Sequence, residues 1–196
     1  MHSHNGARRI YEWYMNLSQE AGPDADLTRH IEQKLSTESE SSKVRALKLL
    51  LAMDLGFHKR FDEAEAVYRS LLTNHAEDDP FPMILLAEQK LHYENDPVAA
   101  RSIINEALDS AFRSGNFRRH ALGVKARVAV RLAEYRTVEE ALKQLMELRI
   151  ERGNLDCGIE RDFFDQLPSR VIDPHVAREF DHHARRRGAS NPRTGP

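Results

Sequence analysis

The chain has 196 residues and a net charge of −2, with 31% charged and 40% hydrophobic residues. This charge balance shows no global basic excess, so we expect neither nucleic acid nor a membrane as a partner. The single cysteine excludes a disulfide within the chain and is typical of a reducing compartment, so a cytoplasmic location is expected. No apolar run approaches the roughly 20 residues of a membrane span.

The N-terminal part, residues 1–41, predicts two amphipathic helices and a polar linker. The first covers residues 7–20 and has one apolar stripe at helical spacing, formed by Ile10, Trp13, Tyr14 and Leu17. Gly22-Pro23 ends this helix, and Asp26 opens the second. The small polar residues at 36–42 contain no apolar anchor and predict a loop.

Residues 42–153 predict six helices joined by short connections, and short connections make consecutive helices antiparallel. Ser42 is the expected cap of the first, Asp96-Pro97 opens the fourth, and Thr137 with Glu140 forms a capping box for the sixth. The expected ranges are 42–56, 61–74, 82–93, 97–114, 116–133 and 137–153. Residues 154–188 predict C-terminal capping helices, and residues 189–196 a disordered tail.

The second helix of each expected pair carries an alanine in a matched setting. Ala64, Ala100 and Ala141 each lie three residues after Phe61, Pro97 or Val138. Four residues after each alanine lies a large side chain, namely Tyr68, Ile104 and Leu145. Nine residues before each alanine lies a leucine, namely Leu55, Leu91 and Leu132. The spacings are 36 residues (100 − 64) and 41 residues (141 − 100). Small residues at these places suit close helix crossings.

This pattern resembles the tetratricopeptide repeat, most closely from Leu51-Ala52 to Tyr68 and in outline over residues 42–151. The resemblance implies an all-α fold of about three stacked hairpins in a curved solenoid that binds peptides or partner domains. The sequence departs from the family at Glu88, where a small residue is expected, and Ala87 stands one place early. Generic helical hairpins without the family's superhelix are the alternative.

In the family, groove-facing positions lie three residues before and one after the small residue of each first helix. Here these positions are Leu49, Met53, Leu85, Gln89, Ala126 and Val130. Because most are apolar, the family's charged clamp for a C-terminal carboxylate is not expected. An amphipathic helix or apolar peptide is expected instead, supplied by another protein, a second copy or the chain's own N-terminal helix. Alternatively, Leu49 and Met53 are ordinary core residues.

No phosphate-binding loop, His-Glu-x-x-His motif or cysteine pair is present, so neither an enzyme nor a cofactor is expected. His175, Glu179 and His183 have metal-capable spacing, with His182 beside them, but solvated side chains on a terminal helix are the favoured interpretation. The sequence therefore predicts an adaptor, scaffold or chaperone-like module that binds a protein or peptide. The alternative is a self-assembling structural protein whose groove is filled by its own N-terminal helix or by a second copy in a homodimer.

Overall fold

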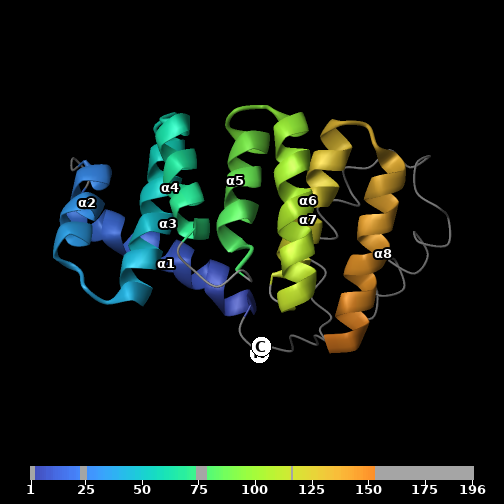
Figure 1. Ribbon diagram of the computed structural model, residues 1–196, viewed down its shortest axis with the longest axis horizontal. Helices are drawn as coiled ribbons and strands as arrows, with labels where there is room; N and C mark the ends of the chain where they lie inside the picture. The colour runs from blue at the N-terminus through green and yellow to red at the C-terminus, as the bar shows by residue number, and fades with distance from the viewer. Residues whose placement is uncertain (1–2, 23–25, 74–78, 116, 153–196) are drawn as a thin grey trace, which may run out of the picture. The chain divides into compact units, whose positions relative to one another are not determined.

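The computed structural model describes residues 3–22, 26–73, 79–115 and 117–152. Every regular element in these residues is an α-helix, which confirms the all-α prediction (Figure 1). The helices are α1 Ser3–Ala21, α2 Leu27–Thr37, α3 Ser41–Phe57, α4 Phe61–Thr73, α5 Phe81–His92, α6 Pro97–Ser114, α7 Arg118–Arg131 and α8 Tyr135–Arg152. The helices and tail expected beyond residue 153 lie outside the described residues.

The chain divides into two compact units, residues 1–121 and residues 122–196. In the first unit, α3 packs against α4 and α5 packs against α6, as expected for two helical hairpins. The hairpins touch through α3 with α5 and through α4 with α5, while α1 and α2 both contact α3. The first helices of the two hairpins are therefore neighbours within this unit.

Several predicted helix ends are confirmed, because capping depends on a few adjacent residues. The Asp26 carboxylate accepts a hydrogen bond from the Arg29 amide at 3.1 Å, and α2 follows it. The Asp96 carboxylate likewise accepts from the Ala99 amide at 2.9 Å. Gly115 ends α6 with φ of 73°, a left-handed conformation that glycine adopts without strain.

Two predicted caps are wrong, one by two residues and the other by three. Helix α3 begins at Ser41 rather than after Ser42, and Glu40 precedes it without a side-chain cap. Helix α8 begins at Tyr135, so Thr137 lies inside the first turn and is not its cap. The Val138 amide donates a hydrogen bond to the Glu134 carbonyl at 3.2 Å, so the helical hydrogen bonding starts at Glu134, three residues before Thr137.

The turns that join α3 to α4, α5 to α6 and α7 to α8 each contain a residue in the left-handed conformation. Lys59, Asn95 and Ala133 have φ of 61°, 55° and 56°, although none is glycine. Each lies two residues before the start of α4, α6 or α8. A left-handed residue at this place is the usual way to end a helix and reverse the chain.

The first and third turns also share their backbone hydrogen bonds. Lys59 donates to the Gly56 carbonyl and Arg60 to that of Leu55, at 3.0 and 2.9 Å. The same pair recurs from Ala133 to Val130 and from Glu134 to Ala129, at 3.1 and 2.9 Å. In the second turn the residue after Asn95 instead bonds back to Lys90, at 2.8 Å, so this turn is one residue longer.

Burial in the second helices follows the positions of these turn residues. Counting five residues on from each left-handed residue gives Ala64, Ala100 and Val138, which are all buried. The positions four and seven residues later are buried as well: Tyr68, Ile104 and Leu142, then Leu71, Ala107 and Leu145. Val138 therefore takes the place that the sequence pattern assigned to Ala141, and the second spacing is 38 residues (138 − 100).

The longer second turn also explains the displaced small residue in α5. Ala52, Ala87 and Ala126 are fully buried in α3, α5 and α7, and they lie seven, eight and seven residues before the left-handed turn residue. In α7 the small residue of the pattern is therefore Ala126, which the sequence pattern placed in the groove, and not Ala129. Glu88, the residue after Ala87, is only half-buried. The small residue of the second hairpin is therefore Ala87, and the extra residue in the turn accounts for its early position.

The left-handed turn predicts a gain in stability from glycine at Ala133. An L-residue with a side chain in this conformation costs roughly 1–2 kcal/mol, and greater chain freedom in the unfolded state offsets part of that cost for glycine. We expect Ala133→Gly to raise the free energy of unfolding by about 0.5–1 kcal/mol in a urea titration.

Ala66→Gly is the matched control, because Ala66 is exposed in the middle of α4. It should lower the free energy of unfolding by about 1 kcal/mol. Equal losses in the two variants would contradict the left-handed turn.

Candidate functional site

The structure separates the six predicted groove residues by burial. Leu49, Gln89 and Ala126 are buried, whereas Met53, Leu85 and Val130 are half-buried and reach the surface. In the first unit, Met53 and Leu85 pack against one core cluster that includes Leu49. Ala126 and Val130 belong to the second unit.

Met53 directly follows the small residue Ala52 in α3, and Glu88 directly follows Ala87 in α5. When the helices are aligned on their turns, Glu88 therefore corresponds to Met53. Glu88 is half-buried, and its Oε1 lies 3.3 Å from Nε2 of His120. His120 also contacts the Phe81 ring edge-on, with 6.0 Å between ring centroids. The surface of α5 is thus more polar here than the sequence pattern predicts.

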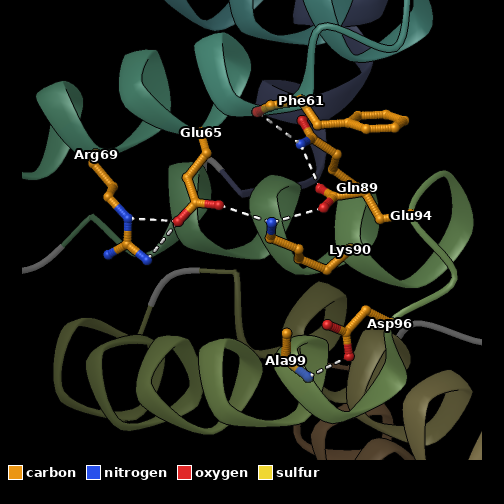
Figure 2. A network of polar contacts seen from close by, with 8 residues as sticks. All are labelled: Phe61, Glu65, Arg69, Gln89, Lys90, Glu94, Asp96 and Ala99. Atoms are coloured by element: carbon orange, nitrogen blue, oxygen red, sulfur yellow. Dashed lines mark hydrogen bonds and ion pairs between the residues drawn. The ribbon is translucent and has the colours of Figure 1, made fainter.

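Gln89 joins the two hairpins of the first unit and is not part of an open groove. Its side-chain Nε2 donates to the Phe61 carbonyl at 3.5 Å and to Glu94 Oε1 at 2.9 Å (Figure 2). A Cβ atom at Gly56 would lie 3.1 Å from Gln89 Oε1. Glycine at position 56 therefore lets α3 approach this amide closely.

Lys90 lies beside Gln89 and bridges two carboxylates (Figure 2). Its Nζ is 2.8 Å from Glu65 on α4 and 2.8 Å from Glu94 at the following turn. The hydrogen bond from Lys90 lowers the pKa of Glu65 below its ordinary value of 4.5. Burial by itself lowers the pKa of Lys90, but hydrogen bonds to Glu65 and Glu94 outweigh burial and raise it above 10.5.

These shifts predict how stability depends on pH. The lowered pKa of Glu65 stabilises the fold above pH 4.5, and this contribution is lost as pH falls through the folded-state pKa. The raised pKa of Lys90 stabilises the fold below pH 10.5, and its contribution is lost as pH rises through the folded-state value. We expect Lys90→Met to lower the urea midpoint at neutral pH and to lower it much less near pH 3.

Lys43→Met is the control for this pH dependence. Lys43 pairs with Glu40 at 2.8 Å, but both side chains are more than half exposed. Exposed pairs contribute roughly 0–1 kcal/mol, so this variant should change little at either pH. A loss for Lys90→Met that is the same at both pH values would exclude the bridge as its cause.

A fully buried carboxylate attaches the N-terminal helices to α3. Asp54 is 0% exposed and accepts hydrogen bonds from Tyr14 Oη on α1 at 2.9 Å and Thr28 Oγ1 on α2 at 2.5 Å. His58 Nδ1 lies 3.6 Å from the same carboxylate. Because a buried polar group must keep its hydrogen-bond partners, this arrangement fixes α1 and α2 against α3. Leu17, also on α1, is buried in the same core.

Removal of the Tyr14 hydroxyl should therefore destabilise the first unit. Tyr14→Phe leaves the buried Asp54 carboxylate with one donor fewer, which typically costs about 1–3 kcal/mol. We expect this loss in the free energy of unfolding measured by circular dichroism. Tyr135→Phe, at an exposed tyrosine of α8, should stay within about 0.5 kcal/mol of wild type. Equal changes in the free energy of unfolding for the two variants would show that the hydrogen bond from Tyr14 to Asp54 does not stabilise the fold.

A row of three aromatic rings, which we call the aromatic edge, consists of the half-buried Tyr14 and the exposed Phe57 and Tyr93. The ring centroids of Tyr14 and Phe57 are 5.7 Å apart, and those of Phe57 and Tyr93 are 5.5 Å apart with the planes at 84°. Phe57 is 42% exposed and Tyr93 is 50% exposed. The row crosses from α1 to the ends of α3 and α5.

Sequence reasoning missed Phe57 and Tyr93 as surface candidates. The available signal was that Phe57 lies four residues after Met53, on the same side of α3. The sequence indicated Tyr93 as a surface residue less clearly. It lies in the turn that is one residue longer, so its position cannot be matched to Phe57 by the repeat spacing alone. Met53 and Leu85 are half-buried, and they and the aromatic edge are among the apolar side chains that reach the surface of the first unit.

Comparison with known proteins gives no match among protein-family models, curated proteins or solved structures. Among the described helices, none combines the length and apolarity needed to cross a bilayer. No group of three metal-capable side chains lies in the described part of the chain, and His175, Glu179, His182 and His183 fall outside it.

Proposed function

We propose that the chain is a helical-repeat interaction module, similar to tetratricopeptide proteins, that binds a segment of another polypeptide. Three turns with a left-handed residue at the same place support the repeat interpretation. The matched burial of Ala52, Ala87 and Ala126 supports it further. Hairpins of this kind present their first helices side by side, as α3 and α5 do in the first unit.

The observation that carries the proposal is the exposure of large aromatic rings beside half-buried apolar side chains. Phe57 and Tyr93 are exposed at the ends of neighbouring helices, and Met53 lies one helical turn before Phe57. Clustered aromatic residues that remain in water are typical of protein-binding surfaces. On this proposal, the binding surface consists of Met53, Leu85 and the aromatic edge in the first unit.

Self-assembly is the second candidate function, with another copy of the chain on the same surface. Leu17 is buried, and Trp13 and Tyr14 pack against the core of the first unit, so the N-terminal helix is already engaged within its own chain. Light scattering tests this candidate: a mass that stays monomeric at high concentration excludes it.

A capture experiment tests partner binding with a matched pair of substitutions. Phe57 and Phe112 are both phenylalanines with 42% exposure, but only Phe57 belongs to the aromatic edge. We expect immobilised wild type and Phe112→Glu to capture the same polypeptide from the source organism's extract, and Phe57→Glu to lose it. A charge on this surface opposes apolar docking.

Circular dichroism should show that both variants remain as helical as wild type. Equal capture by all three proteins would move the interaction away from the aromatic edge. No capture by any of them would argue against a polypeptide partner.

A further inference from the structure

Helix α1 is held to the first unit by few buried side chains. Of its side chains that the structure describes, at residues 12–21, only Leu17 is buried, whereas α3 has eight buried residues. Gly22 follows α1 with φ of 92°, and a Cβ atom there would meet nothing within 4 Å. Segments with little buried apolar surface open at a lower free-energy cost than the core. We therefore expect α1 to leave the unit more easily than α3.

Release of α1 would leave Asp54 with hydrogen-bonding groups beside it. The Tyr14 hydroxyl would go with α1. Thr28 Oγ1 on α2 would still donate to Asp54 at 2.5 Å, and His58 Nδ1 lies 3.6 Å away. Phe57, which is 42% exposed already, would lose the Tyr14 ring. We call Thr28, Asp54 and Phe57 the α1 site, which combines a hydrogen-bond acceptor with an aromatic ring.

We propose that the α1 site binds an amphipathic helix of the partner polypeptide in place of α1. Tyr14 and Leu17 of α1 show what such a helix needs. It carries a tyrosine that donates to Asp54 and packs on Phe57, and a leucine three residues later that enters the core. The partner's tyrosine would replace Tyr14 in the aromatic edge, where Tyr93 already contacts Phe57. This inference rests on the proposed function and specifies the chemistry of its partner.

Helix α1 then acts as an inhibitor within the chain. Because the partner and α1 use the same surface, the partner binds only those molecules in which α1 is released, and its apparent affinity falls by that fraction. A variant that releases α1 should therefore bind more tightly. Leu17→Glu places a charge at a position that is 1% exposed, whereas the control Met15→Glu changes a side chain of α1 that is 44% exposed.

The probe is a fluorescent peptide with the sequence of residues 3–22, and anisotropy follows its binding to three full-length proteins. We expect Leu17→Glu to bind the peptide at least about tenfold more tightly than wild type or Met15→Glu does. The same peptide with Tyr14→Phe should bind Leu17→Glu about tenfold more weakly, because it lacks the hydroxyl that donates to Asp54. Immobilised Leu17→Glu should also capture more of the partner from the extract than wild type captures.

Hydrogen exchange of the wild-type protein tests the release of α1 without a substitution. The amides at residues 14–21 of α1 should be protected about a hundredfold less than those at residues 47–55 of α3, because α1 opens locally while the core stays folded. Equal protection of the two helices would show that α1 opens only with the core, and would overturn the inference.

The binding and capture results can overturn the inference as well. Equal binding of the peptide by the three proteins would place its site elsewhere, and loss of helicity in Leu17→Glu beyond that of α1 would make α1 a part of the core. A wild-type dimer in light scattering that Leu17→Glu disrupts would assign the α1 site to a second copy. Loss of capture by Phe57→Glu without tighter peptide binding by Leu17→Glu would remove only this inference. Equal capture by Phe57→Glu and wild type would remove the proposed binding surface.

Discussion

The left-handed turn residue is the constraint on which the hairpins depend. Lys59, Asn95 and Ala133 each reverse the chain two residues before a second helix begins. This reversal fixes which side chains of the second helix face inward, starting with a small or β-branched residue at Ala64, Ala100 or Val138. Non-glycine residues at such places carry a conformational cost, so packing within each hairpin must outweigh it.

Contacts between successive helical pairs use buried polar groups at one repeated place. Asp54 and Gln89 each lie two residues after the small residue of their helix, and both are buried. Asp54 bonds to Thr28 of the preceding pair, and Gln89 bonds to the Phe61 carbonyl of the preceding pair. Such groups lose much of their hydrogen bonding if the pairs slide, so they favour one stacking register over others. In α7 the same place holds Val128, which is buried and apolar.

Much of the fold could be predicted from the sequence, because helix periodicity and capping are local. Asp26, Asp96 and Gly115 end or open helices where expected. The repeat register in the second and third hairpins could not be predicted, because it depends on a positive φ at Asn95 and Ala133. Neither residue is a glycine that would have marked the turn.

The candidate site was harder to predict than the fold. Leu49 and Gln89 have the sequence spacing of groove residues, yet tertiary packing buries both. Phe57 and Tyr93 were not singled out in the sequence, yet both are exposed in the structure. Exposure is decided by contacts between helices distant in sequence, which local patterns do not encode.

Site-specific photo-cross-linking tests the central claim most directly. The photoreactive residue p-benzoylphenylalanine would replace Phe57 in one protein and Phe112 in another, two side chains of equal exposure. The account predicts that irradiation in the source organism's extract cross-links a discrete polypeptide from position 57 and not from position 112. The same cross-links from both positions, or none from position 57, would contradict a binding surface at the aromatic edge.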